Sequence, residues 1–328
     1  MNKIRICVFV ILFVNFSIFA EIIIPLTKSK GNDKFAIYSP DGDKIVFIRQ
    51  ENSKEGIWLL DIKEKKEYLL TGQLNSPKDI YFSSDSRRIV FSSEGKIYLL
   101  DVSFLSDVKK KYLVNGERPV FSPDGEKIGF IKNRKICVLD NGEEKELTGE
   151  YSNLDIAWVN GEEIIFCGDG NIYILNIKDK KVTLISELRE KLGNNLYYTK
   201  IYVSPNKKEV IAVVPMGLVA PGEDLTRAVG DVLYLVKKDS FEEISYGRNP
   251  CWSSDSKKIV FEDEEEIYIY SITEKRKIKL TDDNYLDERP VFSPDGKSII
   301  FSSVRRDTNN DGIINWKDSL DIYKMVIE

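Results

Sequence analysis

A short turn, Ser-Pro-Asp-Gly or a variant of it, recurs along this chain and is followed each time by an apolar segment. Seven copies have an anchor residue at the same place in the turn: Ser39, Ser83, Ser122, Val159, Ser204, Ser253 and Ser293. Successive anchors lie 44, 39, 37, 45, 49 and 40 residues apart. Units of this length cannot bury both of their faces alone, so the repeat predicts an array of small sheets packed side by side.

Each turn is followed by two apolar segments and a more polar closing one. In the first repeat these are Lys44–Ile48, Ile57–Asp61 and Glu67–Thr71. The middle segments are apolar at consecutive positions, which is typical of strands that are covered on both faces. Blades packed around a ring provide that environment. The sequence therefore predicts an all-β fold, a seven-bladed β-propeller, with a six-bladed ring as the alternative.

The last repeat ends with the chain, at Glu328, before a fourth strand. The segment Glu21–Thr27 has the pattern of a fourth strand, with the Leu-Thr ending of the other closing strands. We expect it to pair with the last blade and close the ring, because closure removes exposed sheet edges.

The first twenty residues have the composition of a secretory signal peptide. Lys3 and Arg5 precede the apolar run Ile6–Val14, and the small residue Ala20 precedes Glu21. An uncleaved membrane anchor is less favoured because the apolar run is short for a bilayer crossing. We expect residues 1–20 to be a signal peptide and residues 21–328 to form one propeller domain. The protein is then periplasmic or extracellular, with no stable membrane span after processing.

Without the two cations of the leader, 46 basic and 53 acidic residues remain, which is a net charge of −7. Such a surface repels phosphate backbones, so we do not expect nucleic acid as a partner. The expected assembly state is a monomer.

The last repeat contains a twelve-residue segment, Asp307–Asp318, that matches an EF-hand calcium loop position by position. The expected ligands are five side chains and one carbonyl group: Asp307, Asn309, Asp311, Ile313 (carbonyl), Asn315 and Asp318. No helical pattern flanks the loop, so we expect a structural Ca²⁺ site between strands. Trp316, inside the loop, is expected to lean on a neighbouring blade. The alternative is a solvated polar turn.

Six of the seven repeats have a cation four or five residues before the anchor: Lys34, Lys78, Arg118, Lys200, Arg248 and Arg289. At this position the chain enters the innermost strand, so these side chains could surround the central channel. Our hypothesis is that they bind an anionic group, such as the acidic terminus of an envelope or secreted protein. The alternative is local pairing with the adjacent acids Asp33, Asp79, Glu117 and Glu288.

The repeated Ser-Pro-Asp-Gly, Lys-x-Ile-x-Phe, Ile-Tyr-x-x-Asp and Leu-Thr segments resemble the propeller repeats of TolB, a periplasmic protein of the Tol-Pal system. The likeness covers residues 21–328 and implies a propeller in the cell envelope, although the α/β domain of TolB has no counterpart here. The Asp307–Asp318 loop is similar to the calcium loop of dockerin modules. Oligogalacturonate lyases share this repeat type, but they place histidines around a metal, and this chain has no histidine.

The absence of histidine excludes Ser-His-Asp and Cys-His nucleophiles and histidine-based metal centres. No Gly-x-Ser-x-Gly elbow or glycine-rich phosphate loop is present. We therefore predict that the protein is not an enzyme but a non-catalytic, protein-binding platform. The alternatives are a carbohydrate-binding module and a glycoside hydrolase that uses carboxylates alone. For glycoside hydrolysis the candidate carboxylates are Asp155, Asp224, Asp287 and Glu288.

Overall fold

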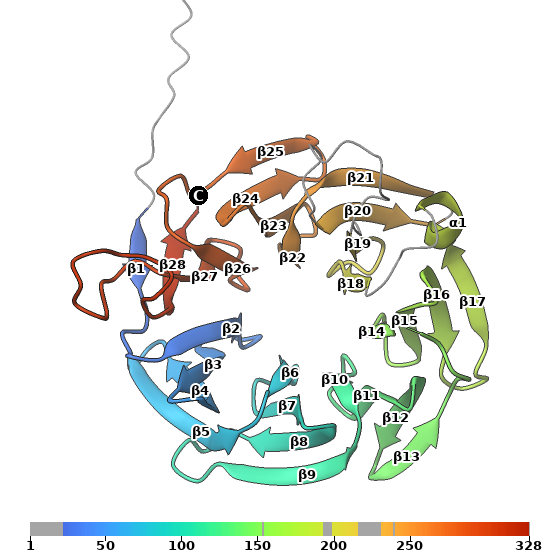
Figure 1. Cartoon of the computed structure of the whole chain (residues 1–328). Helices are drawn as coiled ribbons and strands as arrows, with labels where there is room; N and C mark the ends of the chain where they lie inside the picture. Colours follow the sequence, from blue (N-terminus) through green and yellow to red (C-terminus); the bar gives the residue numbers. More distant parts are fainter. Residues whose placement is uncertain (1–21, 153, 193–198, 216–230, 239, 328) are drawn as a thin grey trace, which may run out of the picture.

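The computed structural model describes residues 22–152, 154–192, 199–215, 231–238 and 240–327. It contains seven four-stranded antiparallel sheets that surround one axis (Figure 1). The prediction of a seven-bladed β-propeller is confirmed, and the six-bladed alternative is excluded. Among the described residues, no helix is long and apolar enough to cross a bilayer.

Six blades follow one another along the chain, each with its strands in sequence order from the axis outward. The first is β2 (Asn32–Tyr38), β3 (Lys44–Glu51), β4 (Lys54–Asp61) and β5 (Lys66–Leu74). The second is β6 (Lys78–Phe82), β7 (Arg88–Ser93), β8 (Lys96–Asp101) and β9 (Lys109–Asn115). The third is β10 (Glu117–Phe121), β11 (Lys127–Lys132), β12 (Lys135–Asp140) and β13 (Glu143–Glu146).

The fourth blade is β14 (Asp155–Trp158), β15 (Glu163–Gly168), β16 (Asn171–Asn176) and β17 (Val182–Ser186), followed by the short helix α1 (Leu188–Leu192). The fifth is β18 (Lys200–Val203), β19 (Val210–Pro215), β20 (Asp231–Lys237) and β21 (Ser240–Tyr246). The sixth is β22 (Arg248–Trp252), β23 (Lys258–Asp263), β24 (Glu266–Ser271) and β25 (Arg276–Lys279). The seventh is β26 (Asp287–Phe292), β27 (Ser298–Ser303), β28 (Asp321–Val326) and, from the start of the chain, β1 (Ile23–Pro25).

The seventh blade confirms the expected closure of the ring. β1 pairs antiparallel with β28, with Ile23 opposite Met325 and Pro25 opposite Tyr323. The backbone N–H of Leu26 also donates to the carbonyl of Ile322 at 2.8 Å. The segment expected to supply the missing fourth strand therefore does so. Glu21 and the expected signal peptide lie outside the described residues.

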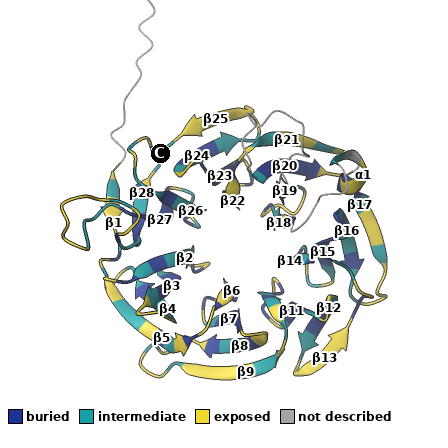
Figure 2. Cartoon of the chain, in the orientation of Figure 1, coloured by how far each residue is buried: buried dark blue, intermediate teal, exposed yellow. Residues whose placement is uncertain are grey.

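The core lies between neighbouring blades, as Figure 2 shows by the dark blue middle strands. Six second strands carry a fully buried phenylalanine: Phe47, Phe91, Phe130, Phe166, Phe261 and Phe301. The clusters that contain these rings join strands of different blades. One cluster, for example, joins Phe47 of β3 to Ile300 of β27. Each blade thus buries its faces against its neighbours, as the length of the repeat requires.

The recurring turn has the hydrogen bonds that its sequence predicts. In the third blade the Ser122 hydroxyl donates to the Asp124 carboxylate and accepts the N–H of Lys127 at 2.9 Å. Asp124 also accepts the N–H of Glu126 at 3.0 Å, and Gly125 has a φ of +74°. The turn is therefore a local structure with an ionised aspartate as its acceptor.

We expect acid to weaken these turns together. The serine hydroxyl, and then the backbone N–H, lower the pKa of Asp124, Asp255 and Asp295 below the ordinary value of 3.8. A lowered pKa means that this stabilisation is present above pH 3.8 and is lost as the pH falls below it. Replacing all three by Asn should therefore flatten the decline of the melting temperature below about pH 4.

The fifth blade supports this choice, because there Asn206 accepts the same bonds from Ser204 and Lys208. Asparagine thus keeps the turn but does not titrate. Scanning calorimetry across the acid range measures the effect, and an equally steep decline in the triple variant would contradict it.

Candidate functional site

The six cations predicted to bind a partner all lie within the first three residues of an innermost strand, next to the axis of the ring (Figure 1). In the remaining blade, β14 begins with Asp155 instead. We call this end of the ring the channel mouth, and it consists of the first residues of the seven innermost strands. Three of these first residues, Lys78, Lys200 and Arg248, are exposed to solvent.

Five innermost strands contain a β-bulge at the channel mouth. In each, the residue four positions before the turn serine has a φ between 50 and 59°, although none is glycine: Phe35, Asp79, Arg118, Asn249 and Arg289. Such conformations cost roughly 1–3 kcal/mol each and persist where the surrounding structure holds them. Bulges redirect side chains and are frequent next to active sites. The repetition of this feature in five blades marks the channel mouth as the candidate site.

The first set of contacts around the mouth links the second, third, fourth and fifth blades. The carboxylate of Asp79 accepts the backbone N–H of Arg118 at 3.2 Å. The guanidinium of Arg118 donates to Asp155 at 2.7 Å. Asp155 in turn accepts the N–H of Ile201 at 2.9 Å. Arg118 and Asp155 therefore hold neighbouring blades together at the axis.

A second set of contacts links the sixth, seventh and first blades. The Arg289 guanidinium donates to Asn249 at 3.4 Å, and on its other side it lies 3.9 Å from the centre of the Phe35 ring. The backbone N–H of Arg289 donates to Glu262. Arg118 and Arg289 are thus contacts between blades, and substituting either one would test the integrity of the ring together with binding.

Three of the other four cations are more accessible, whereas Lys34 is only 25% exposed. Lys34 pairs with Glu55 at 2.8 Å, Lys78 with Glu117 at 3.3 Å, and Arg248 with Glu262 at 2.8 Å. Lys78 and Arg248 are nevertheless 50% and 61% exposed, and Lys200 is exposed without an ion pair to any described residue.

Of the adjacent pairs that the sequence suggested, one is found among the described ion pairs, since Arg289 lies 3.9 Å from Glu288. Glu117 pairs with Lys78 of the second blade and not with its neighbour Arg118. Asp33 instead pairs with Arg49, and Asp79 accepts the hydroxyl of Ser92 at 2.8 Å. The exposed cations Lys78, Lys200 and Arg248 are therefore the ones that an incoming anion can reach.

Burial changes the acid–base properties of the mouth. Burial raises the pKa of Asp155, opposed by Arg118, and raises the pKa of Glu288, opposed by Arg289. It also raises the pKa values of the Tyr81 and Tyr202 phenols. Both phenols are therefore protonated at neutral pH and can donate hydrogen bonds. Two carboxyl groups and two phenols beside accessible cations can bind an anion and can exchange protons with it.

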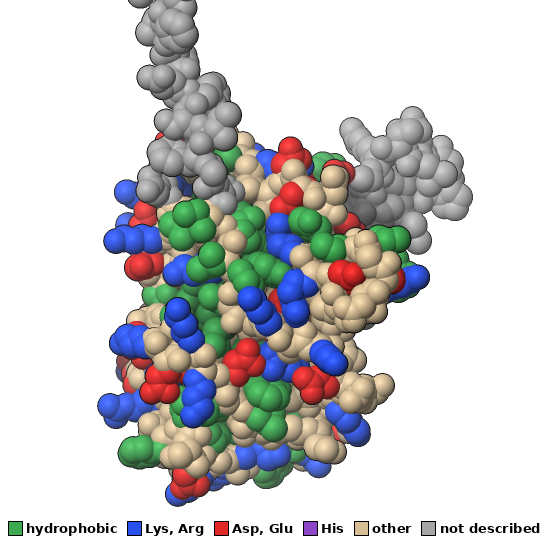
Figure 3. All heavy atoms as spheres, turned by 90° about the vertical axis from the view of Figure 1, so that its left-hand side faces the viewer, with side chains coloured by type: hydrophobic (Ala, Val, Ile, Leu, Met, Phe, Trp, Pro, Cys, Tyr) green, Lys and Arg blue, Asp and Glu red, His purple; other side chains and the backbone are tan. Residues whose placement is uncertain are grey.

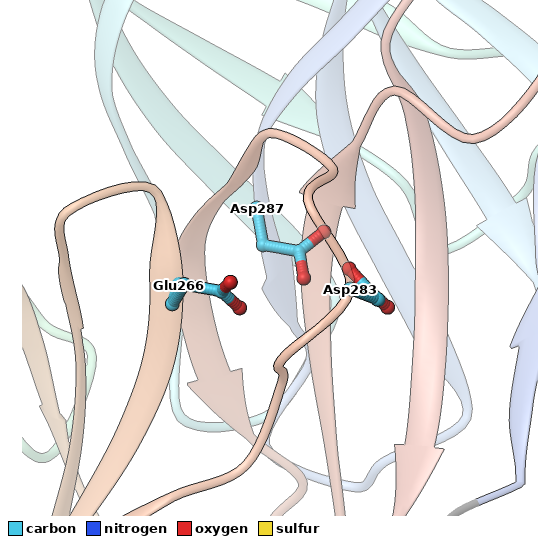
Figure 4. Close-up of side chains that lie close together, drawn as sticks. All are labelled: Glu266, Asp283 and Asp287. Atoms are coloured by element: carbon cyan, nitrogen blue, oxygen red, sulfur yellow. The ribbon is translucent and has the colours of Figure 1, made fainter. Parts of the chain in front are cut away.

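Apart from the channel mouth, a group of three acidic side chains lies between the sixth and seventh blades (Figure 4). Glu266 begins β24, Asp287 begins β26 and Asp283 precedes β26; their carboxylate oxygens lie within 4.8 Å of one another. Among the described residues, this is the one group of three acidic or Cys side chains whose ligand atoms lie this close together, and such a group could hold a metal ion. Arg305 already supplies positive charge there, since it donates to Asp283 and, at 2.7 Å, to Asp287.

The predicted calcium loop connects β27 to β28, strand to strand, as expected. Its carboxylates accept N–H groups of the loop itself: Asp307 accepts from Gly312 at 2.9 Å, and Asp318 from Thr308 at 2.7 Å. Gly312, with a φ of +83°, makes the sharp turn. The expectation that Trp316 packs on a neighbouring blade is wrong, because this side chain is 79% exposed.

The candidate carboxylates for glycoside hydrolysis are not brought together as one set. Asp155 and Glu288 lie at the channel mouth, whereas Asp287 is fully buried and bound to Ser303 and Arg305. Asp224 lies outside the described residues. Tyr81, Tyr202 and Arg305 were not foreseen, because no motif or spacing distinguishes them in the sequence.

Comparison with known proteins gives the fold but no family, and no protein-family profile matches the chain. An oligogalacturonate lyase from Vibrio parahaemolyticus superposes with a TM-score of 0.71 at 14% identity over 95% of each chain. An oligogalacturonate lyase in complex with manganese gives 0.68 at 12% identity over 93% of each. U3-55K gives 0.63 at 10% identity over 93% of this chain.

One curated relative matches by sequence, a Tricorn-like protease C-terminal subunit of Sulfurisphaera tokodaii. It is 25% identical over 304 aligned residues, which cover 83% of this chain and 33% of the relative. This chain thus aligns with about a third of that relative's length. The resemblance to TolB repeats remains a prediction.

These comparisons contradict the prediction that the protein is not an enzyme. The prediction rested on the absence of histidine, of a Gly-x-Ser-x-Gly elbow and of a glycine-rich phosphate loop. These absences exclude particular mechanisms only. This chain is similar in fold to oligogalacturonate lyases and, over most of its length, similar in sequence to a protease subunit.

Proposed function

We propose that the protein is an exported propeller that binds an acidic oligosaccharide at the channel mouth and cleaves it. The observation that carries this proposal is the set of accessible cations, Lys78, Lys200 and Arg248, each the first residue of an innermost strand at the channel mouth. Cations at the mouth can bind the carboxylates of a uronate chain, and phenols can donate hydrogen bonds to its hydroxyls. The fold shared with oligogalacturonate lyases supports this ligand class.

In this proposal, side chains at the channel mouth transfer the protons. Glu288, with its raised pKa, is suited to give or take a proton, whereas Asp155 is held by Arg118. In an elimination, the proton on C5 of a uronate would pass to such a base and the electrons of the C5–H bond would form a C4–C5 double bond. The glycosidic oxygen would leave C4 with its bonding pair and take up a proton. In a hydrolysis, water would be added and no double bond would form.

We expect the variant Lys78→Glu, Lys200→Glu to bind oligogalacturonate at least about tenfold more weakly, because two attractive contacts become repulsive. Its melting temperature should not change, since both side chains are exposed. Calorimetry measures binding, and ultraviolet absorbance of the double bond together with a reducing-end assay measures cleavage. The control is Lys109→Glu, a lysine that is 76% exposed on β9. Equal affinity of the double variant and the parent would contradict the proposal.

The same cations favour a second function, the capture of an acidic protein segment in the cell envelope. The sequence similarity to a protease subunit supports a peptide ligand. An oligoglutamate peptide in the same calorimeter distinguishes the two functions. Binding of the peptide, without binding or cleavage of the oligosaccharide, would favour protein capture. Export is supported by the leader sequence, and N-terminal sequencing of the secreted chain should begin at Glu21.

We further propose that the loop Asp307–Asp318 binds Ca²⁺. The support is the match of its oxygen-bearing residues to the calcium loop pattern and the sharp turn at Gly312. Chelator-stripped protein should give calcium-binding heat with a dissociation constant of roughly 10⁻⁴ M or tighter. Asp311→Ala should abolish this heat, whereas Asp107→Ala, at a residue 73% exposed, should not. A parent protein without calcium heat would end this proposal.

A further inference from the structure

The loop between β27 and β28 ends in an apolar tip. The side chains of Ile313, Ile314 and Trp316 are 63%, 37% and 79% exposed, and Trp316 is the most exposed large hydrophobic side chain in the described residues. Trp158 and Trp252, in contrast, are only 4% and 8% exposed. Three apolar side chains within four consecutive residues on one protruding loop exceed the scattered surface hydrophobics that are usual in soluble proteins.

The tip is presented on an ordered backbone. Asp311 accepts the N–H of Ile313 at 2.9 Å, and the side-chain amide of Asn315 donates to the carbonyl of Ile313 at 3.2 Å. The N–H of Asn315 donates to the buried carboxylate of Asp318 at 2.9 Å. The hydrophobic side chains thus project from a loop that is held by hydrogen bonds of its own. Their exposure is therefore a property of the folded loop.

The base of the loop is fixed beside the closing strand β1. The hydroxyl of Ser319 donates to the carbonyl of Lys30 at 2.9 Å, and Arg306 donates to the carbonyl of Ser29 at 2.8 Å. In Figure 1 the loop and β1 lie side by side at one edge of the ring. The base of the loop therefore lies at the end of β1 where the chain leaves this strand.

The neighbouring strands carry further apolar and basic side chains. Ile22 and Val326, at the ends of β1 and β28 away from the loop, are 65% and 44% exposed, and Ile24 is 41% exposed. Lys317 on the tip and Lys28 and Lys30 after β1 are exposed as well. Figure 3 faces this side and shows hydrophobic, basic and acidic side chains on it.

We infer that this edge docks on a lipid bilayer, with Trp316 and Ile313 entering the interface between head groups and acyl chains. The inference rests on the proposed export, and it concerns a surface other than the channel mouth. The exposed lysines on the tip and at the base of the loop, Lys317 and Lys30, complement anionic lipid head groups.

A bilayer fits the tip better than a protein partner does. A stable protein interface buries about 800 Å² on each side, which three side chains on a narrow loop do not supply. Tryptophan and aliphatic side chains flanked by lysines are, in contrast, typical of membrane interfaces. The lysines add attraction to anionic lipids.

Vesicle flotation of the mature chain tests the inference, with phosphatidylethanolamine and phosphatidylglycerol vesicles, in calcium and in chelator. We expect the parent to float and its fluorescence to move to shorter wavelength as Trp316 leaves water. Lipids brominated in their acyl chains should quench the part of the emission that is lost in Trp316→Phe. The variant Ile313→Ser, Trp316→Ser should bind vesicles at least about tenfold more weakly than the parent. Phe104→Ser, at a residue 76% exposed elsewhere, should bind like the parent.

The channel-mouth variant Lys78→Glu, Lys200→Glu should still float, so failure of the proposed function and failure of this inference are distinguishable. Both substituted tip residues are exposed, and circular dichroism confirms that the variant is folded. A parent that does not float in either buffer, or bromolipids that leave Trp316 unquenched, would overturn the inference. So would a shift in Trp316 emission that depends on protein concentration without lipid, since this would indicate a second copy of the chain as the partner.

Discussion

Deleting residues 21–27 is expected to lower the melting temperature by roughly 5–10 °C. The deletion removes the pairing of β1 with β28, the bond from Leu26 to Ile322, and the Thr27 hydroxyl that accepts the N–H of Ile322 at 2.9 Å. Net hydrogen bonds are worth about 1 kcal/mol each, and the partial burial of Ile23 and Leu26 adds up to about 1 kcal/mol apiece. A loss of about 4 kcal/mol corresponds to a decrease of this size in a large domain.

The same deletion leaves β28 with a free edge. An unpaired strand is a template for association with another chain, so we expect the variant to form oligomers while the parent remains a monomer. Scanning calorimetry and light scattering after gel filtration measure both effects. Ile22→Ser is the control, because this side chain lies just before β1 and is 65% exposed. Parent-like melting of the deleted chain would contradict the role of β1.

Arg49→Leu is expected to cost roughly 3–5 kcal/mol of unfolding free energy at neutral pH, because it leaves a buried carboxylate without its partner. The partner is Asp33, which is fully buried and binds Arg49 through two contacts of 2.6 and 2.8 Å. Arg49 also pairs with Glu67 at 2.7 Å and lies 4.6 Å from the Trp58 ring. Urea unfolding of parent and variant measures the difference.

The cost of this substitution should depend on pH. Burial raises the pKa of Asp33, and Arg49 opposes that rise, so the pKa is higher still in the variant. A raised pKa in the folded state means that the contribution of Asp33 to stability is greatest below its ordinary value of 3.8 and is lost as the pH rises through the folded value. The variant should therefore recover part of its deficit between neutral pH and about pH 5.

Two further variants complete this experiment. Adding Asp33→Asn to Arg49→Leu removes the buried charge and should restore part of the stability at neutral pH. Lys63→Leu is the matched control, since Lys63 pairs with Asp43 on the same blade but is 74% exposed. Exposed pairs contribute about 0–1 kcal/mol. An effect of Arg49→Leu no larger than that of Lys63→Leu would contradict the prediction.

The blades and the closing strand could be predicted because their signals are local. The turn at Ser122 and Asp124 determines its own hydrogen bonds, and the apolar run that follows it determines the next strand. The partners of the charged residues could not be predicted in this way. Lys34 binds Glu55 of the same blade, whereas Asp79 binds the backbone of Arg118 in the next one. Distances between blades decide such pairings, and adjacency in the sequence does not report them.

The strained bulges of the channel mouth also have no sequence signal. Phe35, Asp79, Arg118, Asn249 and Arg289 share a conformation but no residue type. The acidic group of Glu266, Asp283 and Asp287 comes from three separate segments. The error about catalysis had another cause, because the absence of histidine excludes particular mechanisms and not catalysis as such.

The pairing of Ile23 with Met325 joins residues 302 positions apart (325 − 23). The first strand of the ring thus finds its partner only after almost the whole chain has been synthesised. Contacts of such long range form slowly, because loop closure must occur before they are gained. If the proposed export takes place during synthesis, the ring closes only after β28 has crossed the membrane, so the translocation channel passes a chain whose ring is still open.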